Sequence, residues 1–154
     1  MIQDIDLKAL KHRYINGKAM KPGYEAPTIT SGFDPSITSA SGSELTPYNA
    51  NCHCGAVTYT VLVPSLADHK VTSCNCSICS RNGYLSVYPK RTDVIFHTGY
   101  DRLSTYSFGS KTVVHRFCPT CSSSILVDGA EGSDQLAMNV IITSYGPSSC
   151  THES

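Results

Sequence analysis

The sequence contains no tryptophan, has few charged side chains and lacks any long apolar run. Charged residues make up 16% of the 154 positions, and twelve basic side chains balance twelve acidic ones. A chain with no net charge and no basic stripe lacks the electrostatic attraction that nucleic acid or an acidic membrane requires. No segment approaches the length of a membrane span, and the N-terminus has acidic residues where a secretory signal is positive. We therefore expect a cytoplasmic protein, with the nucleus as the alternative compartment, and neither a membrane nor a nucleic-acid partner.

Composition divides the chain into three parts. Residues 1–48 have the composition of an irregular N-terminal extension, which is rich in proline, glycine, serine and threonine from position 21 onward. Its first acidic side chains precede basic ones in the order that suits a short helix. We assign 49–145 to one folded domain and 146–154 to a C-terminal tail.

The folded domain has the two-residue periodicity of β-strands. Apolar side chains at Val57, Tyr59, Val61 and Val63 alternate with threonines. Similar short runs recur at 84–88, 93–97, 103–108, 112–117, 124–127 and 136–142. Turn-forming residues separate these runs, and no long helical pattern lies between them. The sequence therefore predicts an all-β fold of antiparallel strands.

Cysteine is the residue that demands a chemical explanation. Seven of the eight cysteines fall into three groups: Cys52-His53-Cys54, Cys74-Asn75-Cys76-Ser77-Ile78-Cys79 and Cys118-Pro119-Thr120-Cys121. Clustered thiols in a chain without an export signal hold metal more often than they form disulfides, although a set of disulfides or redox pairs is the alternative. Zinc binds four tetrahedral thiolates, and two cysteines one to three residues apart can supply a pair of them from one tight turn.

Seven thiols divide most naturally into four and three. The two outer groups, Cys52, Cys54, Cys118 and Cys121, can close a four-thiolate site that joins distant parts of the chain. The middle group, Cys74, Cys76 and Cys79, leaves a fourth coordination position for water or a substrate thiol. The alternative is that both sites are structural, with the middle one completed by His53, His69, His115 or Cys150.

Three segments of the sequence resemble one known family. They are CHCGAVTYTV at 52–61, CNCSICSRNG at 74–83 and HRFCPTC at 115–121. Together they resemble the glutathione-dependent formaldehyde-activating enzymes, a family that includes the centromere protein V-like proteins. The resemblance runs from about Asn51 to Ile142. One departure is Cys121-Ser122-Ser123, where relatives commonly have Cys-Gly-Ser.

The resemblance implies a fold, two metal ions and an activity. The fold would be a zinc-stapled antiparallel β-tent, and 49–145 would be the zinc-binding catalytic domain. The family pattern assigns Cys52, Cys54, Cys118 and Cys121 to a structural zinc ion, and Cys74, Cys76 and Cys79 to a catalytic one. The implied reaction is the addition of glutathione to formaldehyde, the reverse of a carbon–sulfur lyase reaction.

We therefore expect a zinc-dependent lyase or transferase that adds glutathione or another thiol to formaldehyde or a larger carbonyl compound. Arg81, Asn82, Tyr84 and Lys90 follow the reactive loop and are candidates for contacts with the thiol substrate, the alternative being an ordinary turn and strand edge. A non-catalytic zinc module that binds another macromolecule is the competing function, and a zinc-dependent methionine sulfoxide reductase is a third. A homodimer is one option for the oligomeric state.

Overall fold

The computed structural model describes residues 9–11, 13–28, 45–129 and 132–140. The helix expected near the start of the extension lies largely outside these residues, as do the tail at 146–154 and Cys150. Within the described part, no helix is long and apolar enough to cross a lipid bilayer.

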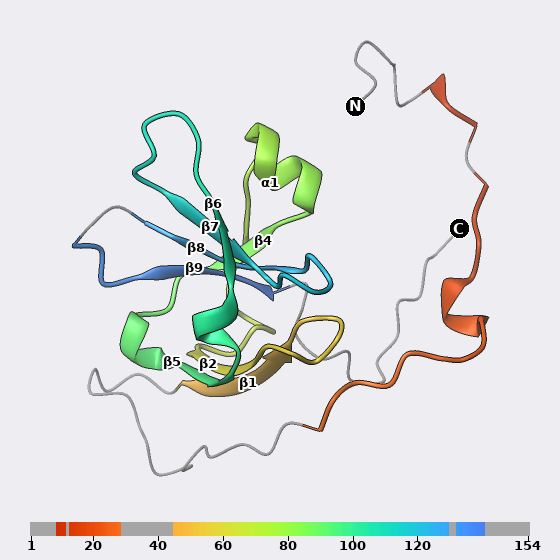
Figure 1. Cartoon of the computed structure of the whole chain (residues 1–154), viewed down its shortest axis with the longest axis horizontal. Coiled ribbons are helices and arrows are strands. Elements are labelled where there is room, and N and C mark those ends of the chain that lie inside the picture. Colours follow the sequence, from red (N-terminus) through yellow and green to blue (C-terminus); the bar gives the residue numbers. More distant parts are fainter. Residues whose placement is uncertain (1–8, 12, 29–44, 130–131, 141–154) are drawn as a thin grey trace.

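The chain forms two antiparallel sheets, which confirms the all-β prediction (Figure 1). The three-stranded sheet has the order β1-β2-β5, and the six-stranded sheet has the order β3-β4-β9-β8-β7-β6. The strands are β1 (Thr46–Asn51), β2 (Thr58–Val63), β3 (Thr72–Ser73), β4 (Leu85–Val87), β5 (Val94–Thr98), β6 (Ser104–Tyr106), β7 (Val114–Phe117), β8 (Ser124–Asp128) and β9 (Leu136–Asn139).

The described part of the chain has four short helical segments, of which η2 precedes the first strand and the other three connect strands. They are the 3-10 turns η2 (Gly17–Ala19), η3 (Arg91–Asp93) and η4 (Tyr100–Arg102), and the α-helix α1 (Ser77–Asn82). Helix α1 ends at Gly83, which adopts the left-handed conformation with φ 63°. That conformation is common for glycine after a helix, and it turns the chain directly into β4.

The core lies between the two sheets and is dominated by β2. Every residue of β2 is buried, so the strand is covered on both faces and not only on the face that the alternating pattern predicts. Tyr59, Val61 and Val63 belong to the apolar cluster, which includes Ile125 and Met138 of the six-stranded sheet. The opposite face of β2 also excludes water.

The second face has two threonines, Thr58 and Thr60, and each of their hydroxyls has a hydrogen-bond partner. The Thr60 hydroxyl donates to Asn49 Oδ1 at 2.7 Å and lies 2.8 Å from His97 Nε2. The Thr58 hydroxyl lies 3.0 Å from that of Thr98. Buried hydroxyls keep their hydrogen bonds here, so the burial of this face carries no large desolvation penalty.

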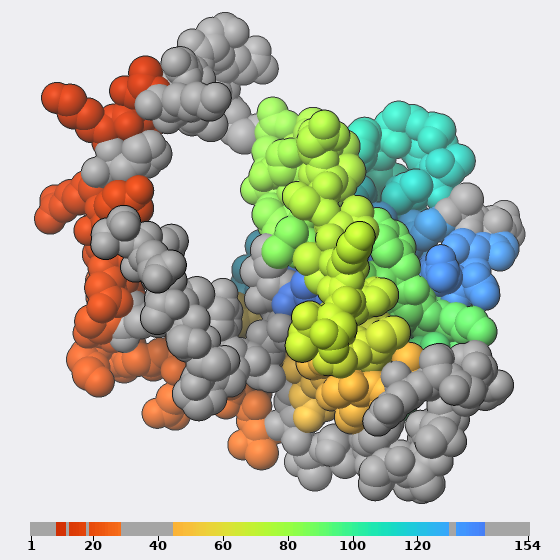
Figure 2. Space-filling view, turned by 180° about the vertical axis from the view of Figure 1, so that it is seen from behind, coloured from red at the N-terminus to blue at the C-terminus, as the bar shows by residue number. Residues whose placement is uncertain are grey.

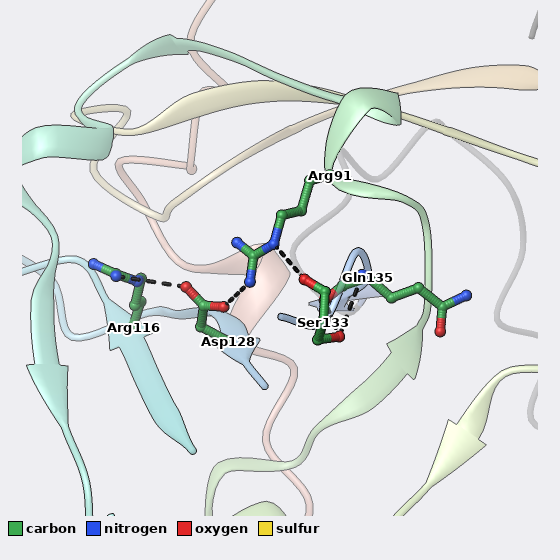
Figure 3. A network of polar contacts seen from close by, with 5 residues as sticks. All are labelled: Arg91, Arg116, Asp128, Ser133 and Gln135. Carbon is green, nitrogen blue, oxygen red and sulfur yellow. Dashed lines mark hydrogen bonds and ion pairs between the residues drawn. The ribbon is translucent and has the colours of Figure 1, made fainter. Parts of the chain in front are cut away.

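An ionic network ties η3 to β7 and β8 (Figure 3). The carboxylate of Asp128 pairs with Arg91 and, at 3.5 Å, with Arg116. Arg91 Nε also donates to the Ser133 carbonyl at 2.9 Å. Arg91 belongs to η3, in the connection between β4 and β5. Its contacts with Asp128 and Ser133 therefore hold this connection against the end of the six-stranded sheet.

Candidate metal centres and their surroundings

The two outer cysteine pairs meet where the two sheets come together. Cys52 and Cys54 lie in the turn after β1, and Cys118 and Cys121 lie in the turn between β7 and β8. Their four sulfur atoms all lie within 4.8 Å of one another, although the pairs are 64 residues apart in the chain. The turn of one sheet thus faces the turn of the other.

The spacing of these sulfur atoms fits a zinc ion. The Cys52 and Cys54 Sγ atoms are 3.6 Å apart, and those of Cys54 and Cys118 are 3.7 Å apart. Four thiolates placed tetrahedrally about 2.3 Å from zinc lie about 3.8 Å from each other, whereas a disulfide bond is only about 2.05 Å long. All seven cysteines in the described part of the chain are free, so the disulfide alternative is wrong for them.

Both turns direct hydrogen-bonding groups toward the thiols. The Val57 N–H donates to Cys52 Sγ at 3.3 Å, and the Ser123 hydroxyl lies 3.3 Å from Cys121 Sγ. The residue after each pair of thiols has a positive φ, 77° at Gly55 and 59° at Ser122. Ser122 therefore holds, without the help of a glycine, the left-handed turn that brings Cys121 back toward Cys118.

Protonation differs between the buried and the better solvated thiols of this four-thiol cluster. Burial raises the pKa of the Cys52 thiol to about 12. Burial also opposes ionisation of Cys121, but hydrogen bonds from the Ser123 hydroxyl and backbone lower its pKa to about 6. Four neighbouring thiols cannot all ionise without a compensating cation, so the cluster suits a divalent metal that would replace the shared protons.

The middle group of cysteines forms a separate, more exposed cluster. Cys74 follows β3, Cys76 is the N-cap residue of α1 and Cys79 lies within that helix. Their sulfur atoms also lie within 4.8 Å of one another, with Cys74 and Cys76 exposed and Cys79 half-buried. Among the described residues, no histidine or acidic side chain joins them as a fourth ligand. His53, His69 and His115 therefore do not complete this three-thiol cluster.

The local hydrogen bonds of the three-thiol cluster favour one thiolate. Hydrogen bonds from the Cys79 backbone and from the Cys79 and Cys74 thiols lower the pKa of Cys76. Burial, with the neighbouring thiols adding to it, raises the pKa of Cys79 to about 12. Of these two thiols, the exposed Cys76 at the start of α1 therefore ionises more readily than Cys79.

The expected substrate contacts lie in different places. Arg81 is exposed on α1, and its Nη1 donates to the Ser77 carbonyl at 2.8 Å, while Asn82 ends the helix. Tyr84 is only 3% exposed. Its N–H donates to the Cys79 carbonyl at 3.0 Å, which places it directly beneath the loop. Lys90 follows β4 and pairs with Gln135, at the other end of that strand from Cys74.

Sequence reasoning missed a row of aromatic rings beside the three-thiol cluster. Tyr84 meets His115 edge to face with centroids 6.0 Å apart, His115 stacks on Phe108 at 5.9 Å, and Phe108 stacks on Tyr106 at 5.8 Å. We call these four residues the aromatic stripe. The alternation of Tyr106 and Phe108 was visible in the sequence, but their approach to His115 depends on the pairing of β6 with β7.

The N-terminal extension contacts the other, four-thiol cluster. Tyr24 stacks on His53 with ring centroids 4.7 Å apart, and its hydroxyl accepts a hydrogen bond from Asn51 Nδ2 at 3.0 Å. A Cβ atom added at Gly55 would lie 3.0 Å from Pro27 Cβ. Tyr24 and Pro27 thus contact the turn that carries Cys52 and Cys54.

The fold and the thiol clusters define a class of small all-β proteins whose cysteine clusters fit metal binding. The match to a family model narrows this class: residues 47–149 match the model of the glutathione-dependent formaldehyde-activating enzyme, and the chain belongs to this family. Family membership implies glutathione-dependent formaldehyde activation, and the cysteine clusters fit metal binding.

The chain also has a structural relative among proteins of known structure. The chain is similar to a protein of Rhodobacter sphaeroides known from a crystal structure, with 32% sequence identity and a TM-score of 0.55. The similarity covers 64% of this chain and 91% of that one.

Proposed function

We propose that this chain is a zinc-dependent carbon–sulfur lyase of the S-(hydroxymethyl)glutathione synthase type, working in the direction of thiol addition. Glutathione would add to formaldehyde or to a larger carbonyl compound at the three-thiol cluster. One observation carries the proposal: three thiols converge on an exposed loop with no fourth protein ligand among the described residues. The four-thiol cluster, in contrast, has its full set of ligands and has two thiols, Cys52 and Cys118, with no exposed surface.

The proposal assigns two zinc ions, one to each cluster, with different tasks. Zinc bound to Cys74, Cys76 and Cys79 would supply positive charge that favours the ionised form of an incoming thiol at neutral pH. The protein itself leaves this site open to substrate, because Cys74 and Cys76 are exposed. It also keeps the three sulfur atoms together through the hydrogen bonds of the loop and the start of α1.

The reaction needs no oxidant or reductant. The thiol of glutathione gives up its proton, its sulfur forms a bond to the carbonyl carbon, and the π-electron pair moves to the carbonyl oxygen. That oxygen then takes a proton, and the product is a hydroxyalkyl thioether. Sulfur attack on a carbonyl held close by gains mainly from proximity and from the ionisation of the thiol.

The thiol substrate has carboxylates that a cation can recognise. Arg81 is the best placed of the expected contacts, because it lies on α1 two residues after Cys79 and its guanidinium is exposed. Asn82 can add a hydrogen bond from the end of the same helix. Tyr84, being buried, would support the loop, and Lys90 would act only on a ligand that extends along β4.

A spectroscopic titration tests the proposal. Protein substituted with cobalt(II) should gain sulfur-to-metal charge-transfer absorption on addition of glutathione, because its thiolate would occupy the open position. S-methylglutathione has no thiol to ionise and serves as the matched ligand control. Flat spectra with both compounds would reject thiol binding at the metal and would favour a non-catalytic zinc module.

A further inference from the structure

The aromatic stripe begins at the three-thiol cluster and ends at the surface. Tyr84 and His115 are buried, with 3% and 6% of their surfaces exposed, whereas Phe108 and Tyr106 are 47% and 51% exposed. Each ring contacts the next at about the distance at which aromatic rings attract one another. The stripe is thus a continuous row of contacting rings from beneath Cys79 to the surface, and Phe108 and Tyr106 form its exposed end.

The stripe and the reactive loop lie at the same end of the molecule. In Figures 1 and 2, α1 and the hairpin loop between β6 and β7 rise side by side from the six-stranded sheet. Val113, on the same hairpin, is also 40% exposed. A group of exposed apolar side chains beside a reactive centre indicates a contact surface for a ligand more readily than scattered single residues do.

The interior end of the stripe contains an unpaired polar atom. His115 Nδ1 is buried and has no hydrogen-bond partner. Burial lowers the pKa of His115, so its ring is neutral near pH 7. The stripe therefore presents uncharged rings along its length, which suits a flat apolar group and not a carboxylate.

We infer that the aromatic stripe receives an aryl substituent of the carbonyl substrate, so that this chain prefers an aromatic aldehyde to formaldehyde. This inference rests on the proposed function, since it names the substrate class of the same site. Formaldehyde has one carbon and one oxygen, and it has no group that could contact Phe108 or Tyr106 while its carbon reacts with sulfur. An aryl aldehyde has a ring directly beside the reacting carbon, and this ring can stack on the exposed rings of the stripe, Phe108 and Tyr106.

The chemistry of the step is unchanged for the larger substrate. Sulfur of the thiol forms the new carbon–sulfur bond, the carbonyl π-pair moves to oxygen, and the thiol proton ends on that oxygen. The product is an α-hydroxybenzyl thioether in place of a hydroxymethyl one. No co-reactant besides the thiol and the aldehyde is required.

Binding of two stable thioethers tests the inference without turnover. Calorimetric titration of the zinc-loaded protein should give an affinity for S-benzylglutathione about tenfold higher than for S-methylglutathione, the size expected of one good aromatic contact. Phe108→Ala should abolish most of this preference. Phe108→Tyr keeps an aromatic ring at this position and should retain the preference. Tyr88→Ala removes another exposed aromatic ring, at the end of β4 away from the stripe, and should leave the preference intact.

The outcomes separate this inference from the proposed function. Equal affinities for the two thioethers, a preference that survives Phe108→Ala, or no binding of either compound would each overturn the aryl assignment. Glutathione-dependent changes in the cobalt spectrum would still support thiol chemistry in those cases. A benzyl preference that depends on Phe108, together with a flat cobalt spectrum, would support aryl binding at the stripe but reject the proposed reaction and, with it, the aromatic aldehyde as substrate.

Discussion

Single residues with left-handed backbone shape both turns of the four-thiol cluster. Gly55 and Ser122 follow Cys54 and Cys121, and their positive φ values reverse the chain so that its N–H groups face the sulfur atoms. Most residues avoid this region, because it brings Cβ too close to the backbone. The serine at position 122 shows that the turn is fixed by its surroundings: its N–H donates to the Cys118 carbonyl at 2.9 Å.

Gly99, the residue before η4, lies against the chain just after the first of these turns. It has a φ of 78°, and a Cβ added there would lie 2.4 Å from the carbonyl oxygen of Ala56, just after the Cys52–Gly55 turn. We expect Gly99→Ala to lower the free energy of unfolding by about 3 kcal/mol, since left-handed strain and a backbone clash act together. Urea unfolding followed by tyrosine fluorescence measures the loss.

Gly109 offers the matched control for this substitution. Its φ of 58° is also positive, but a Cβ there would meet no atom within 4 Å. Gly109→Ala should therefore cost only the backbone strain, about 1 kcal/mol. Equal losses for the two variants would show that the contact with Ala56 contributes nothing.

At the scale of secondary structure, the sequence predicted the strands with a clear two-residue period. The runs around β2 and β4 to β9 are all strands, with ends that shift by a few residues. Strands β1 and the two-residue β3 were missed, and the first three residues of β1 lie in the segment expected to be irregular. The β1 sequence TPYNAN is rich in residues that disfavour strands, but β1 is an edge strand of its sheet, where a proline is tolerated.

The candidate site was predictable only in part, because some of its features depend on strand pairing and not on the local sequence. Ligand spacing within a turn is a local property, so the division of the thiols into four and three could be drawn from the sequence. Helix α1 has only six residues, too few for a helical period to show. The aromatic stripe depends on strand pairing and on a side chain beyond the reactive loop, neither of which local patterns specify.

The Arg91–Asp128–Arg116 network holds three elements together and can be tested as one unit. Asp128→Asn would leave two guanidinium groups facing each other without the carboxylate between them. We expect a loss of about 1 kcal/mol in the free energy of unfolding, since the partners are partly solvated. High salt should shrink this difference, because ions screen solvated charge pairs.

The control for the network is an acidic side chain elsewhere. Asp68 is exposed in the turn after β2, and Asp68→Asn should change stability by less than about 0.5 kcal/mol. The prediction is wrong if the Asp128 variant is as stable as the wild type at low salt. It is also wrong if its loss is unaffected by salt.

At the scale of the whole molecule, the four-thiol cluster connects the two sheets at one edge. One pair of thiols follows β1 of the three-stranded sheet, and the other lies between β7 and β8 of the six-stranded sheet. A metal held there would be a cross-link between segments 64 residues apart. The three-thiol cluster draws its ligands from residues 74–79 alone, so a metal held by it would close only a short loop.

This difference predicts opposite effects for two cysteine substitutions. Cys118→Ser should lower the free energy of unfolding by several kcal/mol and should increase hydrogen exchange in both sheets, because the metal cross-link is lost. Cys76→Ser should leave exchange in both sheets close to that of the wild type, since its thiol is exposed and local. Metal content measured on both variants should fall from about two zinc ions per chain to about one.

A chelator added to the wild type should first remove the zinc of the three-thiol cluster, while the amides of both sheets stay protected from hydrogen exchange. Only the later loss of the second zinc should remove that protection. If Cys76→Ser loosens both sheets as much as Cys118→Ser does, the separation into a structural and a reactive site cannot hold.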